Sequence, residues 1–251
     1  MSKISQLHPR AESLRVREKL VKALKSNIVV PEGLTAHGRG EAFDYILGEK
    51  TTVQARRAIE AAVAMLLSAQ RPVISVNGNA AALAPKFIVR LAGAVGAKIE
   101  VSLFHASRKR EIAIASWLRK NGAKEILGVD KKFSARIDEI QSNRMKVDRR
   151  GIFVADVVLV QVEDGDRTEA LKSRGKRVIA IDLNPMSRTA QAADVSIVDN
   201  IVRTLPLMAE HAEHRPRGRQ KLNKIIRNFD NNINLKETYT HMREKLWKLS
   251  K

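Results

Sequence analysis

The chain contains no cysteine, and no apolar run in it approaches the length of a membrane-spanning helix. The first absence excludes disulfide bonds, thiolate metal sites and cysteine nucleophiles, so any metal ligands are histidine or carboxylate side chains. The second excludes a transmembrane helix, which needs about 20 apolar residues, and the first residues also lack the apolar core of a signal peptide. We therefore expect a protein of the cytoplasm that does not bind a membrane.

Aromatic residues are scarce, at 4% of the chain, whereas basic residues are in excess and give a net charge of +19. Such a charge favours a polyanionic partner, because Lys and Arg neutralise phosphates. However, the charge is spread along the chain, and few aromatic side chains are present to stack on single-stranded bases. Nucleic acid is therefore not the expected main partner, and a basic nucleotide- or nucleic-acid-binding regulatory protein is the alternative function.

Two common nucleotide-binding fingerprints are also missing. No GxGxxG follows a strand, and no GxxxxGK[ST] occurs in the sequence. The first absence argues against a standard dinucleotide-binding oxidoreductase, and the second argues against a P-loop enzyme. Any nucleotide site must therefore use other contacts.

What is present is an alternation of short apolar strands with helices. Apolar, β-branched runs predict strands at 72–76, 98–104, 156–162, 177–181 and 194–198, and helical patterns lie between them. This alternation is typical of a parallel sheet with right-handed crossovers. We predict an α/β fold with a Rossmann-like parallel sheet flanked by helices, and with added N- and C-terminal helices.

Three regions are expected to form one structural domain. Residues 1–50 hold an N-terminal helix and a loop, residues 51–205 form the Rossmann-like core, and residues 206–251 form a helical extension. The extension is predicted as two helices, separated by an Asn-rich break, that cap the core or pair subunits. Residues 128–150 are charged and aperiodic, so we expect a loop or excursion there.

Polar clusters follow the predicted strands, and in an open parallel sheet the ligand crevice lies beyond the carboxyl ends of the strands. They are Asn77-Gly78-Asn79, Glu163 to Glu169, Asp182 to Thr189, and Asp199-Asn200. Amides beside a glycine can bind phosphate or carboxylate oxygens, and an acid can accept from ribose hydroxyls. The acidic run could hold Mg²⁺ through water or accept from an amine. Each cluster could equally be a turn or a helix cap.

Basic side chains elsewhere add to this prediction of an anion site. The run His37-Gly38-Arg39-Gly40-Glu41 places a guanidinium among glycines, which suits bidentate phosphate contact, or it is a solvated loop held by an Arg and Glu pair. By position alone, Arg17 is a surface charge on the first helix. His105 follows strand 98–104 and is either an acid, a base or a phosphate ligand, or a structural histidine.

Long and chemically unusual strings run through the chain: His8-Pro9-Arg10, Arg17 to Leu20, Gly33 to Thr51, Pro72 to Asn79, Gly122-Ala123, Ala155 to Val160, Glu163 to Ala170, Ala180 to Ala190, and Ile197 to Asn200. At these residues the chain resembles the archaeal phosphopantothenate synthetase family, also called 4-phosphopantoate:β-alanine ligase. The Asn-rich hinge between the C-terminal helices is similar as well.

The resemblance implies a homodimeric, ATP-dependent ligase of archaeal coenzyme A biosynthesis. ATP would activate the carboxylate of 4-phosphopantoate as an acyl-adenylate with release of diphosphate. The amine of β-alanine would then displace AMP and give 4'-phosphopantothenate. The implied ATP contacts are Arg17, Arg39, Asp182, Leu183, Asn184, Ser187, Arg188, Asp199 and Asn200. This replaces the surface interpretation of Arg17.

The other substrates are expected at Asn77, Gly78, Asn79, His105 and Arg167. ATP is expected with Mg²⁺, and we assign no metal ligand and no catalytic base. Adenylation needs cations beside the phosphates and acceptors for the ribose, which these residue types supply.

The chain departs from the family pattern in two places. Ala106-Ser107-Arg108 stands after His105 where an Arg-Thr pair is expected, and Arg108 could replace that pair in recognising phosphopantoate. Residues 128–150 do not align. Their Arg144, Arg149 and Arg150 are either surface charges or part of the partner subunit's site.

Overall fold

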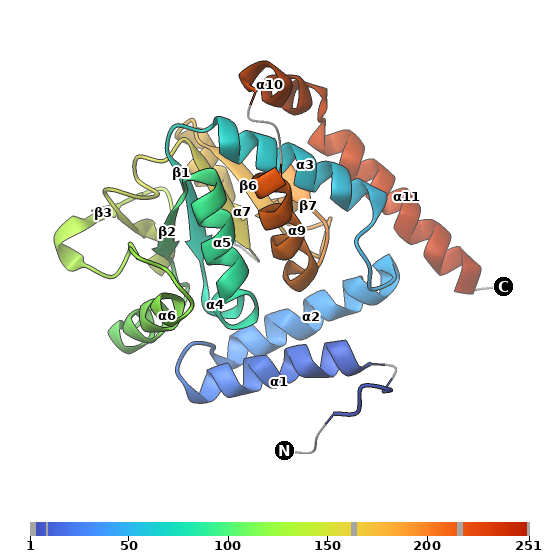
Figure 1. Cartoon of the computed structure of the whole chain (residues 1–251), viewed down its shortest axis with the longest axis horizontal. Helices are drawn as coiled ribbons and strands as arrows, with labels where there is room; N and C mark the ends of the chain where they lie inside the picture. The colour runs from blue at the N-terminus through green and yellow to red at the C-terminus, as the bar shows by residue number, and fades with distance from the viewer. Residues whose placement is uncertain (1–3, 9, 162–164, 215–217, 250–251) are drawn as a thin grey trace.

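A five-stranded parallel sheet forms the centre of the molecule, in a computed structural model that describes residues 4–8, 10–161, 165–214 and 218–249 (Figure 1). Its strands are β1 (Pro72–Val76), β2 (Lys98–Val101), β5 (Val157–Gln161), β6 (Arg177–Ile181) and β7 (Val195–Ile197). Their order across the sheet is β2-β1-β5-β6-β7, and every neighbouring pair is parallel. The predicted α/β class and parallel sheet are confirmed, although β2 ends three residues earlier than the expected strand 98–104.

Helices flank the sheet and extend from it at both ends of the chain. They are α1 (Ala11–Lys25), α2 (Pro31–Leu47), α3 (Val53–Ser68), α4 (Gly78–Leu83), α5 (Pro85–Val95), α6 (Arg108–Lys120), α7 (Gly165–Ser173), α8 (Arg188–Ala192), α9 (Ile201–His214), α10 (Arg219–Asn228) and α11 (Asn231–Leu249). Among the described residues, none of these helices combines the length and the apolar character needed to cross a membrane.

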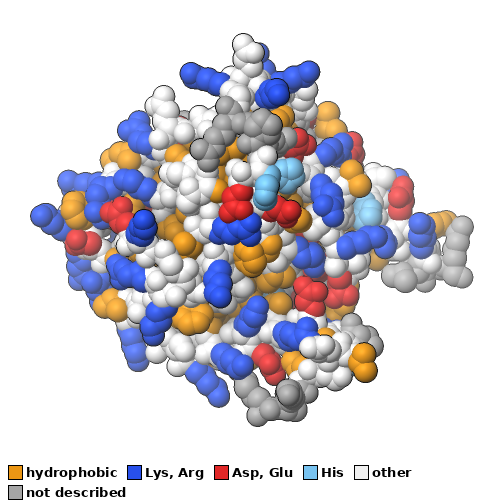
Figure 2. All heavy atoms as spheres, viewed as in Figure 1, with side chains coloured by type: hydrophobic (Ala, Val, Ile, Leu, Met, Phe, Trp, Pro, Cys, Tyr) orange, Lys and Arg blue, Asp and Glu red, His pale blue; other side chains and the backbone are white. Residues whose placement is uncertain are grey.

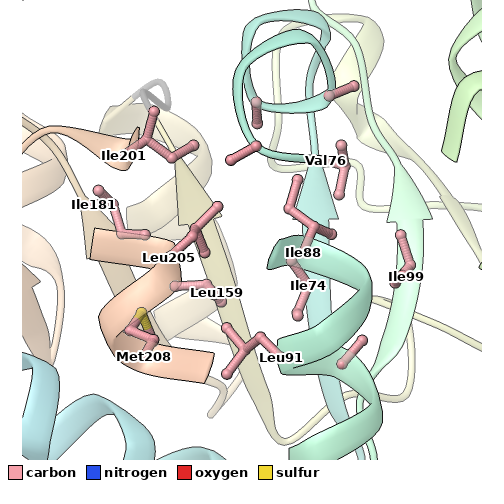
Figure 3. Close-up of a cluster of buried hydrophobic side chains, with 14 of the residues drawn as sticks. Ile74, Val76, Ile88, Leu91, Ile99, Leu159, Ile181, Ile201, Leu205 and Met208 are labelled. Carbon is pink, nitrogen blue, oxygen red and sulfur yellow. The ribbon is translucent and has the colours of Figure 1, made fainter. Parts of the chain in front are cut away.

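Both faces of the sheet are buried, which explains why its strands are almost wholly apolar. Successive side chains of a strand point to opposite faces. Ile74 and Leu159 face one side, where they pack with side chains of α5 and α9 (Figure 3). Val73, Val158 and Val178 face the other side, which is covered by α7 and by the excursion that follows α6.

The excursion contains secondary structure that the sequence did not reveal. Residues 128–150, expected as a loop or excursion, include the antiparallel pair β3 (Ser134–Arg136) and β4 (Lys146–Asp148) and two short 3-10 turns, Lys131–Phe133 and Asn143–Met145. Ile137, Ile140 and Val147 are fully buried against the sheet. Because these apolar residues are widely spaced, the sequence shows neither helical nor strand periodicity there. In the structure they cover one face of the sheet, as helices do elsewhere in the fold.

The segment around His37, predicted as a loop, is part of helix α2. Gly33 of this helix permits close packing rather than flexibility. A Cβ atom at Gly33 would lie 2.5 Å from the Asn79 side-chain oxygen. The loop prediction was therefore wrong, because glycine was taken as a sign of a turn where it allows α2 to approach the sheet.

The C-terminal helices pack on the core, as one of the two predictions for them stated. Leu222 of α10 is buried, and Leu235 of α11 packs with Leu47 and Val198. Helix α11 begins at Asn231, inside the expected Asn-rich break. Asn231 accepts a hydrogen bond from the backbone N–H of Ser196 (2.7 Å), which ties the start of the helix to β7.

Lys and Arg side chains are spread over the face shown in Figure 2, interleaved with apolar and acidic side chains. They do not gather there into one continuous stripe. This distribution gives no support on that face to a dedicated nucleic-acid groove.

Candidate active site

Helix α2 lies across the carboxyl ends of four strands and closes a cleft of about 800 Å³, open to solvent. We call it the strand-end cleft. Its lining from α2 and from the ends of β1, β5, β6 and β7 comprises Ala36, His37, Arg39, Gly40, Phe43, Asn77, Asn79, Ala80, Leu83, Gln161, Ile181, Asp182, Leu183, Asn184, Ser187, Asp199, Asn200 and Ile201. A concave lining with apolar walls and a few polar groups at strand ends is typical of sites that bind small molecules.

The cleft sits where the topology predicts a ligand. The chain crosses from β1 to β2 on one side and continues from β5 to β6 on the other, so the strand order reverses between β1 and β5. The side-chain amide of Asn77 bridges this point by donating to the backbone carbonyl of Gln161 (2.6 Å). Its Oδ1 accepts from the N–H of Ala80 (3.0 Å), so Asn77 also caps α4, as the alternative interpretation stated.

Asp182, directly after β6, forms the floor of the strand-end cleft. One carboxylate oxygen accepts from the hydroxyl of Ser187 (2.6 Å), and the other accepts from the N–H of Asn184 (3.0 Å). Burial raises the pKa of Asp182, while these hydrogen bonds and the charge of Arg39 act in the opposite direction. A carboxylate has about four acceptor positions, so Asp182 keeps capacity for ribose hydroxyls.

Asp199 and Asn200 belong to a buried polar network that the sequence did not reveal. Arg203 donates to Asp199 through Nε (2.9 Å) and to Asp44 through Nη2 (2.5 Å). Asn200 also donates to Asp44 (3.0 Å), and Asp199 accepts from the hydroxyl of Thr51 (2.7 Å). Burial by itself lowers the pKa of Arg203, but its hydrogen bond to Asp44 and the charges of both carboxylates raise it. The network ties the C-terminal half of α2 to the turn after β7.

A second cleft, of about 790 Å³, adjoins the first and is rich in cations. We call it the arginine cleft. It is lined by Val30, Glu32, Gly33, Ala36, Arg39, Asn77, Gly78, Asn79, Leu103, Phe104, His105, Arg110 and Arg144. Three guanidinium groups and one imidazole face a single carboxylate, so the lining favours an anion.

Gly78 allows Arg110 to enter this cleft. A Cβ atom at Gly78 would lie 2.2 Å from the carbonyl oxygen of Ile28 and 2.8 Å from Nη2 of Arg110. Arg110 donates to that same carbonyl (3.0 Å) and to the backbone carbonyl of His105. Two fixed carbonyls therefore orient the guanidinium.

The two clefts share one wall, formed by Ala36, Arg39, Asn77 and Asn79. Arg39 is exposed and forms no hydrogen bond or ion pair with any residue that the structure describes. Burial raises the pKa of Asp182, and the positive charge of Arg39 opposes that rise. Arg39 is thus a cation that can reach ligands in both clefts.

A cluster of charges joins α1 to α2 behind the shared wall. Glu41 accepts from Arg17 through both carboxylate oxygens, at 3.0 and 3.2 Å from Nε, and it also accepts from Ser13. Burial by itself would raise the pKa of Glu41, but the hydrogen bonds from Arg17 and Ser13 hold it below its ordinary value. Burial lowers the pKa of His37, which lines the strand-end cleft. The predicted Arg and Glu pair exists, but its arginine is Arg17 rather than Arg39.

Several predicted site residues do not line either cleft. Arg17 faces Glu41, and Arg188 pairs with Glu169 on the surface (2.7 Å). Arg167 is fully buried and donates to the hydroxyl of Ser75 (3.1 Å). Arg167 is therefore buried beside β1 and is not part of the lining of either cleft, and its predicted contact with a substrate stays a prediction.

The structure also shows which of the arginines in and near the excursion line a cleft. Arg108 donates to the carbonyl of Val129 and lies 3.5 Å from Glu111, so it does not line the arginine cleft. Arg144, predicted as a surface charge or a partner-subunit residue, is buried and lines that cleft in this subunit. Arg150 stacks on Phe133 and pairs with Asp148 (3.0 Å), and Arg149 donates to a carbonyl of the excursion.

No group of three or more His, Asp or Glu side chains within the described ranges could hold a metal ion. Glu163 and Asp164, proposed for Mg²⁺ or for an amine, lie outside the described residues. The remaining acids of that run, Asp166 and Glu169, stand in α7, and Glu169 pairs with Arg188.

Three residues of the site were missed by the sequence: Gln161, Arg203 and Arg110. One of them could have been found, because Gln161 is the polar residue that ends the apolar run of β5, as Asn77 follows β1. Arg110 stands beside two other basic residues, and only the rotation of α6 selects it. Arg203 carries no local signal.

Comparisons with known proteins agree with one another. A family model described as "Phosphopantothenate/pantothenate synthetase" matches residues 54–245. Over 252 aligned residues, a "4-phosphopantoate--beta-alanine ligase" of Thermococcus onnurineus is 50% identical, and one of Thermococcus kodakarensis is 49% identical; both alignments cover 100% of this chain and 96% of the relative. A protein of the same description from Methanosarcina mazei is 48% identical over 247 residues, with 98% of this chain and 96% of the relative covered.

Proposed function

The chain belongs to the phosphopantothenate/pantothenate synthetase family, and we propose that it is a 4-phosphopantoate:β-alanine ligase of coenzyme A biosynthesis that consumes ATP. The observation that carries this proposal is the shared wall between the two clefts. A nucleotide in the strand-end cleft and an anionic acyl substrate in the arginine cleft would meet there, beside Arg39. Two bound substrates held in contact react much faster than free ones.

We place ATP in the strand-end cleft. Asp182 has acceptor capacity for ribose hydroxyls, Ser187 and Asn184 fix its orientation, and Asp199 and Asn200 supply polar groups at the end of β7. Arg39 supplies positive charge for the phosphates. Arg17 and Arg188 stay proposed contacts, and either would have to leave its carboxylate partner to reach a nucleotide.

We place 4-phosphopantoate in the arginine cleft. Its phosphate would bind Arg110, Arg144 and His105, which line the arginine cleft and do not line the strand-end cleft. Its carboxylate would then point toward Asn77, Asn79 and Arg39. Guanidinium groups suit phosphate because they donate two parallel hydrogen bonds.

The proposed reaction has two steps. A carboxylate oxygen of 4-phosphopantoate attacks the α-phosphorus of ATP, the bond from that phosphorus to the bridging oxygen breaks, and diphosphate leaves. The unprotonated amine of β-alanine then attacks the acyl carbon, the bond to the AMP oxygen breaks, and AMP leaves while the amine proton passes to solvent. Arg39 would stabilise the negative charge in the first step.

Mg²⁺ is not assigned to particular protein ligands, because no group of three or more His, Asp or Glu side chains is found among the described residues. ATP commonly brings Mg²⁺ on its own phosphate oxygens and water. The chain's contribution in this proposal is to orient and to neutralise the substrates.

The homodimer is also a proposal. Leu246 and Trp247 are half or more exposed near the end of α11, which extends beyond the body of the molecule (Figure 1). Exposed apolar side chains of this kind are common at subunit contacts. Light scattering would give twice the mass of the chain if the proposal is correct.

Product analysis tests the proposed function. The protein should form AMP and 4'-phosphopantothenate only when ATP, 4-phosphopantoate and β-alanine are all present. Formation of ADP would refute the adenylate mechanism. Arg39→Ala should lose about 10²-fold or more in kcat with an unchanged Tm, because Arg39 has no partner among the described residues. Arg15→Ala, an exposed arginine on α1, is the matched control and should keep full activity.

A second pair of variants tests the arginine cleft. Arg110→Ala should raise the KM for 4-phosphopantoate, whereas Arg108→Ala, two residues away on the same helix, should not. If Arg108→Ala raises this KM and Arg110→Ala does not, the phosphate of the substrate binds beside Arg108, as the sequence suggested.

A further inference from the structure

Gln161 is a buried amide with no internal partner. Only 1% of the residue is exposed, and neither its Nε2 nor its Oε1 has a hydrogen-bond partner among the residues that the structure describes. Buried side-chain amides are normally satisfied, since a lost hydrogen bond is not replaced by water. An amide left in this state at a cleft indicates that a ligand satisfies it.

The described neighbours of Gln161 along the strand are apolar, and its side chain lines the strand-end cleft. Its side chain follows Leu159 on the same face of β5, and its neighbour across the β5 and β6 register is Ile181. The strand therefore places a polar amide at the end of an apolar stripe. Gln161 also lines the strand-end cleft.

Gln161 lies beside the wall that the two clefts share. Its backbone carbonyl accepts from the side-chain amide of Asn77, which belongs to that wall, while Gln161 itself lines the strand-end cleft. The strand order reverses between β1 and β5 at this place. This hydrogen bond fixes β5 against the residues at which ligands of the two clefts would meet.

We propose that Gln161 is a catalytic residue whose side-chain amide donates a hydrogen bond to the reacting carboxylate of the acyl substrate and holds it against the nucleotide. The inference rests on the proposed function. A neutral donor suits this task, because it orients the anionic nucleophile without adding a second ion pair to the one that Arg39 would form. The Oε1 atom remains available to accept from the incoming amine.

The test compares three variants with the wild type. Gln161→Met keeps the size of the side chain but removes the amide. Its kcat should fall about 10²-fold, the loss seen when one preorganised donor is removed, while the KM for ATP changes little. Exchange of labelled diphosphate into ATP, measured with 4-phosphopantoate and without β-alanine, should fall by the same factor. The matched control, Gln191→Glu on the exposed side of α8, should behave as the wild type.

Thermal unfolding distinguishes this role from a structural one. Because the amide has no partner within the described protein, Gln161→Met should leave Tm unchanged or higher. A structural amide would instead lower Tm when removed. A kcat within about threefold of the wild-type value would overturn the proposal, because the loss of one preorganised donor lowers kcat far more than that. A rise in the KM for ATP at unchanged kcat would assign Gln161 to the nucleotide and overturn it as well.

Gln161→Glu provides a second measurement if the Met variant does not fold. The introduced carboxylate would repel the substrate carboxylate at neutral pH, and kcat should recover as the pH falls and the new group is protonated. A variant as active as the wild type at neutral pH would refute the role. If the wild type and Gln191→Glu both form no phosphopantothenate, the proposed function itself fails, and that result is separate from any effect at Gln161.

Discussion

Replacing Arg203 by methionine should destabilise the protein and weaken the nucleotide binding proposed for the strand-end cleft. Arg203 is the cation between Asp44 and Asp199, and the side chains of these two acids are 6% and 1% exposed. It donates to Asp44 through two nitrogens and to Asp199 through two, at 2.5 to 3.2 Å. Arg203→Met therefore leaves two buried carboxylates whose remaining donors are neutral groups.

The size of the effect follows from this geometry. Removing one partner of a buried ion pair typically costs about 3–5 kcal/mol. Because the Arg203 side chain keeps 19% exposure, water can partly solvate the space it leaves, and we expect a value near the lower limit, about 3 kcal/mol. For a chain of this size that corresponds to a fall in Tm of roughly 6–12 °C.

The activity should change in a defined way. Arg203 joins the turn after β7 to α2, and α2 carries Arg39 into both clefts. A looser α2 should raise the KM for ATP more than it lowers kcat, when assays are run well below the Tm of the variant. Calorimetry and initial-rate kinetics give both quantities.

Two further variants make this reasoning refutable. Arg90→Met breaks an exposed pair with Glu213 and should leave Tm almost unchanged. Adding Asp44→Asn to Arg203→Met should recover part of the lost stability, because one uncompensated charge is removed. A fall in Tm below about 2 °C for Arg203→Met, or no recovery in the double variant, would show that the network does not hold α2.

Three other predictions concern separate parts of the molecule. Burial raises the pKa of Glu100 to about 7, so the stability that this group contributes is complete below about pH 4.5 and is lost as the pH rises through 7. Denaturant titrations should show the wild type losing about 3 kcal/mol relative to Glu100→Gln between pH 4.5 and 8, and parallel profiles would contradict this. Gly78→Ala should displace Arg110, raise the KM for 4-phosphopantoate and cost about 1–3 kcal/mol, whereas Gly38→Ala, where a Cβ atom meets nothing within 4 Å, should not. Thr52→Ala removes the N-cap of α3 and should lower the free energy of unfolding by about 1 kcal/mol in calorimetry with kcat unchanged; a lower kcat would indicate a wider role.

Much of the fold could be predicted from the sequence because its signals are local. Apolar β-branched runs became β1, β5, β6 and β7 with boundaries within one residue, since a strand buried on both faces must be apolar throughout. The threonine cap of α3 and the left-handed Gly122 after α6 also depend only on neighbouring residues. The excursion after α6 could not be predicted, because its few apolar residues are ordered by the sheet face that they cover.

The strand-end residues of the site could be predicted for the same reason. The carboxyl ends of parallel strands lie at one edge of the sheet, so polar residues that follow β1, β6 and β7 must lie near one another. Asn77, Asp182 and Asp199 line the strand-end cleft accordingly. Sequence order and strand direction were sufficient for this part.

Only the tertiary structure decided which basic side chains face the clefts. Arg108 and Arg110 are alike in sequence, but the rotation of α6 directs one to a carbonyl of the excursion and the other into the arginine cleft. Arg167 follows β5 as a binding residue would, yet it is buried in the core. A long side chain on a helix can point to solvent, core or ligand, and the choice depends on the packing of elements distant in sequence. The sequence by itself determined the sheet and the edge at which the strand-end cleft lies, and the packing determined which charges reach that edge.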